Sequence, residues 1–235
     1  MKIINLISGP RNLSTALMYS FSRRPDTNVI DEPFYAHYLS TTGIDHPGRD
    51  ETLKFMSADI NEVLSNIFLN QKCEVLFLKN MAHHHQQMKL DFLENMTNLF
   101  LVRNPHQLIA SFAQVIQNPT MQDIGLEKSW ELFNIVKRQN PIVLDSAEIL
   151  KDPKGLLKKL CKKLQIKFYD EMLSWKKGGI KEDGPWAKFW YKNVHNSNGF
   201  TKQKTSSREL PKNCQSLYIE SLKYYDKLSS NSITV

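Results

Sequence analysis

The sequence predicts an α/β protein built on a central parallel sheet of about five strands flanked by helices. Two observations support this prediction: short apolar runs of strand length recur along the chain, and segments with apolar residues at helical spacing lie between them. Such alternation is typical of a parallel sheet with helices on both faces. The 235 residues are 41% hydrophobic, which suffices for one domain, so we expect residues 1–235 to form a single domain.

Each element follows from its local pattern. The runs of strand length are Ile3–Ile7, Asn28–Ile30, Val75–Leu78, Leu99–Val102 and Ile142–Leu144. The helical patterns lie at Ser14–Arg24, Glu51–Asn70, His106–Gln117, Leu126–Arg138 and Pro153–Leu164. Residues 175–200 combine four glycines with several aromatic side chains. This segment fits either a glycine-hinged lid over a pocket or a C-terminal wrap that buries its aromatic residues.

Composition and charge narrow the class of protein. A formal net charge of +7 would suit a polyanionic partner, but the sequence contains no zinc-finger pattern, aromatic RNA-binding signature or basic low-complexity tail, so we expect no nucleic-acid partner. The apolar runs are too short for a secretory leader or a membrane span. The three cysteines, Cys73, Cys161 and Cys214, fit no metal-site spacing. Together these patterns favour a cytoplasmic protein with no metal site.

The first strand runs into the stretch SGPRNLSTAL, which combines a turn, a cation and a helix start. Gly9 and Pro10 end the strand, and Arg11 adds a permanent positive charge. Ser14 or Thr15 lies at or near the start of the helix. The first turn of a helix offers unpaired N–H groups and the positive end of the helix dipole, so phosphate or sulfate binds there. The stretch predicts either an anion cradle or a plain helix cap with a solvated arginine.

Polar segments also follow three later strands, with the sequences DEPFYAHY, KNMAHHH and RNPHQLIASF. In a parallel sheet, ligands bind beyond the carboxyl ends of the strands, so we expect these segments to meet at one edge. A carboxylate pair, a lysine with histidines and two arginine-bearing turns predict a pocket for an anionic ligand beside potential bases. Adjacent histidines cannot all face one ligand, so we expect at least one of the three to be exposed.

The fourth strand ends at Arg103, and Ser111 follows eight residues later. This pair resembles the 3′-phosphate motif of the sulfotransferases that use 3′-phosphoadenosine 5′-phosphosulfate (PAPS). The resemblance implies that Arg103 and Ser111 hold the 3′-phosphate of PAPS. That family also carries an Arg-Lys-Gly loop near its C-terminus, which is absent here; Lys202, Lys204 and Arg208 are candidate replacements on the basis of charge alone.

The opening stretch resembles the phosphosulfate-binding loop of the same family, Pro-[Lys/Arg]-Ser-Gly-Thr-Thr. The matching positions are Pro10, Arg11, Ser14 and Thr15. The resemblance implies that these residues, together with Asn12 between them, bind PAPS. Asn12 stands where serine is usual and Leu13 where glycine is usual. Because leucine enters positive φ less readily than glycine, we expect a somewhat different loop path. The resemblance implies a P-loop-type domain that uses PAPS as donor, releases 3′-phosphoadenosine 5′-phosphate (PAP) and requires no metal.

More narrowly, the chain resembles a bacterial-type group of uncharacterised sulfotransferase-like proteins with a DEPF segment, here residues 31–34, and a W-A-x-x-W-Y segment, here residues 186–191. Two candidate bases follow from different branches of the family. Glu32 matches a glutamate after the second strand, whereas His83 or His84 stands near a histidine after the third. Lys79 matches the lysine of that third motif, and we expect it to touch the transferred sulfuryl group. Asp31 is expected to order its turn or to pair with Arg11.

These motifs predict a PAPS-dependent sulfotransferase that acts on a hydroxyl or amine of a small-molecule acceptor. The acceptor pocket is expected around Tyr35, His37 and Tyr38, with the segments near Phe55 and Trp190. One alternative is a P-loop small-molecule kinase, which the absence of the G-x-x-x-x-G-K-[ST] pattern disfavours. The other is a non-catalytic nucleotide-binding protein that keeps the cradle but lacks a working base.

Overall fold

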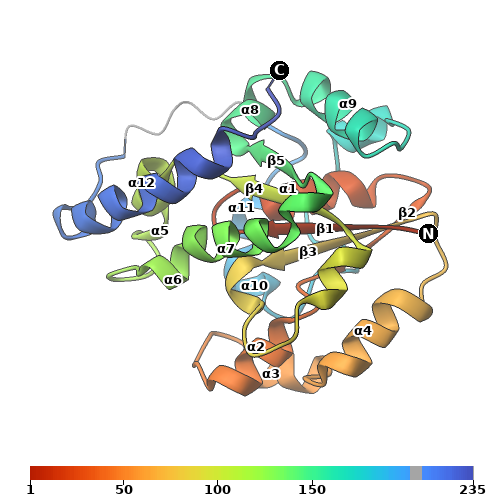
Figure 1. Cartoon of the computed structure of the whole chain (residues 1–235), viewed down its shortest axis with the longest axis horizontal. Helices are drawn as coiled ribbons and strands as arrows, with labels where there is room; N and C mark the ends of the chain where they lie inside the picture. Colours follow the sequence, from red (N-terminus) through yellow and green to blue (C-terminus); the bar gives the residue numbers. More distant parts are fainter. Residues whose placement is uncertain (202–207, 235) are drawn as a thin grey trace.

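The computed structural model describes residues 1–201 and 208–234, and its five strands form one all-parallel sheet, which confirms the predicted fold class (Figure 1). The strand order is β2-β3-β1-β4-β5, and each neighbouring pair is parallel. The strands are β1 (Lys2–Ser8), β2 (Thr27–Asp31), β3 (Val75–Met81), β4 (Thr97–Val102) and β5 (Ile142–Asp145). All five lie at the apolar runs from which they were predicted.

Helices connect the strands and close the chain. Their bounds are α1 (Ser14–Ser22), α2 (Tyr35–Thr42), α3 (Arg49–Phe55), α4 (Ile60–Leu69), α5 (Pro105–Phe112), α6 (Met121–Ile124), α7 (Leu126–Val136), α8 (Ser146–Lys151), α9 (Pro153–Lys163), α10 (Ala187–Trp190), α11 (Lys192–His195) and α12 (Gln215–Ser229). The single helix predicted over 51–70 is wrong, because the structure divides it into α3 and α4. Met56 is extended at the break, and the Asp59 side chain caps α4 by accepting from the Asn61 N–H.

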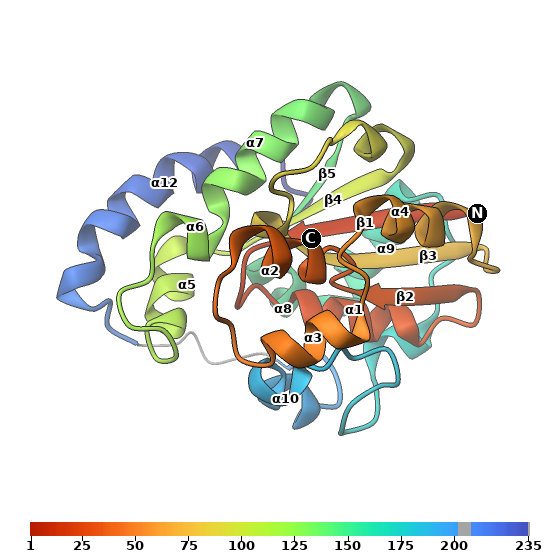
Figure 2. The same cartoon turned by 90° about the horizontal axis from the view of Figure 1, so that it is seen from below.

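Helices cover both faces of the sheet, and the strands alternate their side chains between them (Figures 1 and 2). On β1, Ile4 and Leu6 belong to the core cluster that includes α1, α9 and residues of 175–200. Ile3 and Ile7 belong to the opposite cluster, with α4, α5, α7 and α12. Since both faces of the sheet are buried against apolar side chains, the strand sequences are nearly continuous hydrophobic runs.

The carboxyl ends of β1 to β4 meet at one edge of the sheet, as the sequence predicts for the four polar segments. The loop 9–13 leads from β1 into α1, and the 3₁₀ helix η1 (Ala82–His84) directly follows β3. Residues 175–200 reach this edge as well, with Trp186 and Tyr191 buried in the core. In the part of the chain that the structure describes, no helix is long and apolar enough to cross a membrane.

Candidate active site

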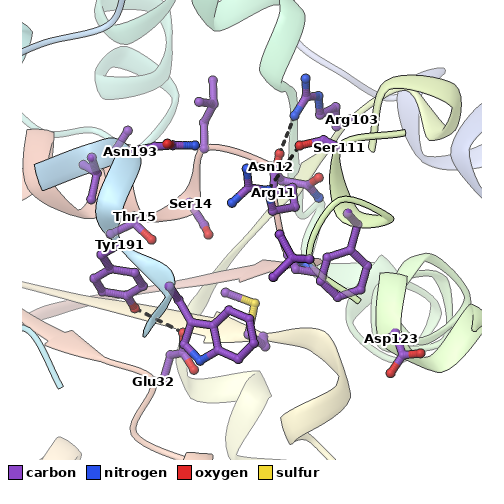
Figure 3. A pocket seen from close by; sticks show the side chains of 18 of the residues that line it. Arg11, Asn12, Ser14, Thr15, Glu32, Arg103, Ser111, Asp123, Tyr191 and Asn193 are labelled. Carbon is purple, nitrogen blue, oxygen red and sulfur yellow. Dashed lines mark hydrogen bonds between the residues drawn. The ribbon is translucent and has the colours of Figure 1, made fainter. Parts of the chain in front are cut away.

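A cavity of about 670 Å³ lies at the carboxyl edge of the sheet (Figure 3). Its wall contains all seven residues that the family resemblance assigns to PAPS: Pro10, Arg11, Asn12, Ser14, Thr15, Arg103 and Ser111. Three of the four catalytic candidates, Glu32, His83 and His84, also line it. The fourth, Lys79, lies behind the wall. The fold therefore brings together segments that are about a hundred residues apart in the sequence.

The loop from β1 to α1 holds a strained backbone. Arg11 has φ 61° and Leu13 has φ 69°, which is the left-handed region that favours glycine. Leu13 thus adopts the kind of conformation that a glycine would supply at this position. Gly9 is required for a different reason: a Cβ there would lie 2.2 Å from the Ile124 carbonyl oxygen. The Asn12 side chain anchors the loop by donating to the Leu101 carbonyl at 3.1 Å.

The helix that follows this loop leaves its first N–H groups available. Leu13 occupies the N-cap position, and no side chain accepts a hydrogen bond there. The first turn of α1 also contains no acidic residue that would compete for these N–H groups. Ser14 and Thr15 begin the helix and line the cavity. An anion is the ligand that such a helix start favours.

Three arginines converge on the cavity near the end of β4. The Nε of Arg11 donates to the Ser111 hydroxyl at 3.2 Å, and Nη1 of Arg208 lies 3.4 Å from the same oxygen. Arg103 donates through Nη1 to the backbone carbonyl of Arg11 at 2.8 Å. Burial lowers the pKa of Arg11 and of Arg103, and the positive charges of the neighbouring arginines lower it further. Such mutual repulsion is relieved when an anion binds between them.

Among the three candidate replacements for the missing C-terminal loop, Arg208 is the one that the structure places in the wall. Lys202 and Lys204 lie outside the described residues. The Arg11–Ser111–Arg208 contacts join the start, middle and end of the chain. In the sequence, Arg208 was a candidate because of its charge alone. The structure shows in addition that it contacts Ser111.

A buried ionic cluster lies at the opposite side of the cavity. Lys79 is 0% exposed and donates from Nζ to Oδ1 of Asp31 at 3.1 Å, to Oε1 of Glu32 and to the Tyr191 hydroxyl at 2.6 Å. Burial alone would lower the pKa of Lys79, but the two carboxylates outweigh it and raise that pKa. Burial raises the pKa of Asp31 to about 6, against the opposing attraction of Lys79. The tyrosine completes the cluster by accepting from Trp186 Nε1 at 3.0 Å.

This cluster corrects two expectations. Asp31 pairs with Lys79 and not with Arg11, because it lies directly opposite Lys79 in the register of β2 and β3. The expected contact of Lys79 with a transferred group is not supported by its position, since its three donor bonds are all directed into the cluster. Lys79 instead holds one oxygen of Glu32. Glu32 itself turns out of β2 with φ 44°, a third strained residue on the cavity wall.

The histidines after β3 are enclosed by aromatic rings. His84 stacks on Tyr35 with ring centroids 4.5 Å apart, and its Nδ1 lies 3.8 Å from Oε2 of Glu32. Burial lowers the pKa of His83 to about 3 and that of His84 well below its usual value, so both rings are neutral near pH 7. His85 turns away from the cavity and packs on Phe34. None of the three is exposed, so that expectation is wrong.

The acceptor region was predicted in part. Tyr35, Tyr38 and Trp190 line the cavity, as expected. His37 and Phe55 do not: the His37 ring nitrogens face the Ala58 and Gln87 carbonyls at 3.1 and 3.3 Å, and Phe55 is 69% exposed. Two residues that sequence reasoning missed, His46 and Asp123, also line it. His46 follows no strand, and Asp123 belongs to an ordinary capping box, so neither had a recognisable signal. No group of three or more metal-ligating side chains occurs within 1–201 and 208–234.

The fold and this cavity define an α/β protein in which the loop between the first strand and first helix and the arginines after the fourth strand line the same cavity. Residues 1–231 match the model of the sulfotransferase domain family, and the chain belongs to that family. This agrees with the resemblance carried by the two phosphate motifs.

Two curated relatives come from Arabidopsis thaliana. The branched-chain-amino-acid aminotransferase-like protein 1 is 35% identical over 98% of this chain, and the similarly named protein 2 is 34% identical over 90%. The chain spans only 42% and 38% of the lengths of these relatives. Their names therefore describe proteins more than twice as long as this chain.

Solved structures support the fold. The sulfotransferase domain of the Synechococcus PCC 7002 olefin synthase has a TM-score of 0.60 at 15% identity, covering 96% of this chain and 94% of that domain. A sulfotransferase from Alicyclobacillus acidocaldarius has a TM-score of 0.55 at 12% identity, covering 99% of this chain and 97% of that one. At these identities the likeness shows a shared fold only.

Proposed function

We propose that the protein transfers a sulfuryl group from PAPS to a hydroxyl or amine of a small-molecule acceptor. The observation that carries this proposal is the arrangement of one cavity: two adjacent sites for anions, the arginines around Ser111 and the start of α1, lie on one side, and the carboxylate of Glu32 lies on the other. A donor with phosphate groups at both ends of its ribose requires two such sites. An acceptor that loses a proton during transfer requires a base on the side of the cavity opposite these two sites.

The residues present fit this donor. Arg103, Ser111 and Arg208 would hold the 3′-phosphate: Nη1 of Arg208 lies 3.4 Å from the Ser111 hydroxyl, and Arg103 lines the same cavity, where it donates to the Arg11 carbonyl. Arg11 and the free N–H groups at the start of α1 would hold the 5′-phosphosulfate. An ordinary triphosphate site would need the lysine of the G-x-x-x-x-G-K-[ST] pattern, which this loop lacks.

In the transfer, the acceptor oxygen or nitrogen forms a bond to sulfur, and the bond from sulfur to the bridging phosphate oxygen breaks. The electron pair of that bond leaves on PAP, and the acceptor proton passes to Glu32. Arg11 and the first N–H groups of α1 stabilise the negative charge that develops on the leaving phosphate. Positioning supplies much of the rate. Proton removal by Glu32 contributes roughly two to four orders of magnitude.

Calorimetric titration of the protein with PAP, AMP and ATP with magnesium tests this proposal. We expect tight binding of PAP, weaker binding of AMP because it lacks the 3′-phosphate, and no selective binding of ATP. Selective ATP binding, or no binding of PAP, would contradict the proposal. If PAP binds but radiolabelled PAPS gives no transfer to any hydroxyl or amine offered, the non-catalytic nucleotide-binding alternative replaces it.

A further inference from the structure

The charges on the cavity wall are segregated (Figure 3). The described wall residues include three arginines, Arg11, Arg103 and Arg208, and no lysine. These arginines lie at the side assigned to the donor. The side assigned to the acceptor carries two carboxylates, Glu32 and Asp123, without a cationic neighbour on the described wall. Lys79, behind the wall, neutralises part of the negative charge of Glu32. Because Lys79 also pairs with the buried Asp31, the three side chains together keep a net negative charge. This side of the cavity is therefore negative.

Asp123 presents a free oxygen in a fixed position. Its Oδ2 accepts from the N–H of Thr120 at 2.8 Å and from the Thr120 hydroxyl at 2.7 Å, which forms the capping box of α6. No hydrogen bond to Oδ1 occurs within the described residues. The negative charge of Asp123 favours a higher pKa for Tyr38, His46 and His83, which line the same cavity.

Stacked rings line the side of the cavity assigned to the acceptor. Tyr38 stacks on His84 with centroids 4.9 Å apart, and His84 stacks in turn on Tyr35. Burial lowers the pKa of His46, as it does for His83 and His84, so no imidazolium offsets the two carboxylates near pH 7. Aromatic faces beside carboxylates form the environment that attracts an organic ammonium group.

A second, independent feature lies next to Glu32. His84 is 1% exposed and lines the cavity, yet its Nδ1 is buried without a hydrogen-bond partner. This nitrogen lies 3.8 Å from Oε2 of Glu32, so a single oxygen can lie within hydrogen-bond distance of both. Because a buried polar atom without a partner is costly, the pair points to a ligand hydroxyl at this position.

We infer that the acceptor is a hydroxylated organic amine, with its hydroxyl between Glu32 and His84 and its ammonium group against Asp123 and the Tyr38 ring. This inference rests on the proposed function and narrows it to one substrate class. The hydroxyl oxygen forms the new bond to sulfur, the sulfur–oxygen bond to the phosphate breaks with its electron pair leaving on PAP, and the hydroxyl proton passes to Glu32. The ammonium group takes no part in the chemistry.

Three phenols of similar shape and different charge test this inference with PAPS as donor. Tyramine carries an ammonium group, 4-ethylphenol is its neutral analogue, and 4-hydroxyphenylacetate carries a carboxylate. We expect kcat/KM for tyramine to exceed that for 4-ethylphenol at least tenfold, and 4-hydroxyphenylacetate to be the poorest. In Asp123→Asn, which keeps a capping side chain, the ratio of tyramine to 4-ethylphenol is expected to fall severalfold. Asp45→Asn, which removes an exposed carboxylate outside the cavity, is expected to leave this ratio unchanged.

Binding measurements distinguish a failure of the acceptor inference from a failure of the proposed function. Calorimetry with PAP tests the donor site in each protein, and saturation-transfer NMR with tyramine and the PAP-loaded protein tests the acceptor site without turnover. Normal PAP binding with equal use of all three phenols, or a preference for the carboxylate, would overturn the inference and leave the proposed function standing. Loss of the tyramine preference in Asp45→Asn but not in Asp123→Asn would also overturn it. Absence of PAP binding would overturn the proposed function itself.

Discussion

Nζ of Lys79 lies 3.1 Å from Oδ1 of Asp31, and both side chains are almost completely buried behind the cavity wall. Glu32 joins this pair, so one cation is shared by two carboxylates. The tyrosine at the end of the W-A-x-x-W-Y segment donates to Asp31 at 2.8 Å, and the Gly184 N–H donates to the same carboxylate. The cluster therefore fastens residues 184–191 to the candidate base.

Removing the positive charge of Lys79 should mainly lower the free energy of unfolding of the protein. We expect Lys79→Met to lower the free energy of unfolding by about 3–5 kcal/mol, because it leaves two buried carboxylates without a positively charged partner. The double variant Lys79→Met with Asp31→Asn should recover part of this loss. Urea denaturation of the parent protein, both single variants and the double variant measures these effects, and strictly additive losses in the double variant would contradict a shared cluster.

Arg103 is expected to discriminate between adenosine nucleotides. Arg103→Ala should weaken PAP binding roughly tenfold to a hundredfold, because it removes charge-assisted hydrogen bonds, and should weaken AMP binding much less. Calorimetry with both nucleotides measures the difference. The matched control is Arg138→Ala, which removes an exposed arginine after α7. An equal loss for PAP and AMP would show that Arg103 acts through its bond to the Arg11 carbonyl and not on a 3′-phosphate.

The strands, and the residues that follow them, could be predicted because both are local features of the sequence. Apolar runs marked all five strands, and the edge rule for parallel sheets then placed Arg11, Glu32 and Arg103 around one cavity. The break between α3 and α4 was missed because Ser57 and Asp59 interrupt an otherwise continuous helical pattern only through side-chain capping bonds.

Features that depend on tertiary packing could not be predicted. The role of Lys79 depends on its register against Asp31, which places it beneath the wall and not in it. Asp123 comes from the connection between α5 and α7, where nothing in the sequence indicates that the chain returns to the cavity. The positive φ at Leu13 contradicts the usual preference of leucine and is imposed by the surrounding loop.

The strained backbone at Leu13 predicts that glycine is more stabilising than alanine at this position. At most positions alanine is more stabilising than glycine, but at Leu13 the left-handed backbone costs an L-residue about 1–2 kcal/mol. We therefore expect Leu13→Gly to be more stable than Leu13→Ala by about 1 kcal/mol in thermal or urea denaturation. The same comparison within α1, Ala16 against Ala16→Gly, should give the opposite order. The same order at both positions would contradict a left-handed Leu13.

Glu32 provides the most direct test of the base. Glu32→Gln keeps the shape of the side chain and should preserve PAP binding while lowering kcat at least tenfold, because it cannot accept the acceptor proton. Glu94→Gln, an exposed change after β3, is the matched control. Normal turnover in Glu32→Gln, together with loss of turnover in His84→Ala or His83→Ala, would transfer the role of base to the histidine.

The enclosed histidines predict how stability changes with pH. Burial lowers the pKa of His85 to about 4 from an ordinary value of 6.5 in the unfolded chain. Between these values the unfolded chain binds more protons, so this contribution to stability is complete above about pH 6.5 and is lost as the pH falls towards 4. His83 acts in the same direction, whereas Asp31, with its raised pKa, acts in the opposite one.

The contribution of His85 can be isolated with a side chain that does not titrate. His85→Asn keeps a donor for the Met81 carbonyl, which the His85 ring contacts through Nδ1 at 3.3 Å. Between about pH 7 and pH 5 the parent protein should lose roughly 2 kcal/mol more unfolding free energy than this variant, since one unit of pKa corresponds to about 1.4 kcal/mol. Urea denaturation at the two pH values measures this difference. Equal losses in both proteins would mean that His85 is protonated as readily in the folded state as in the unfolded chain, and that its enclosure by Phe34 does not exclude the charged form.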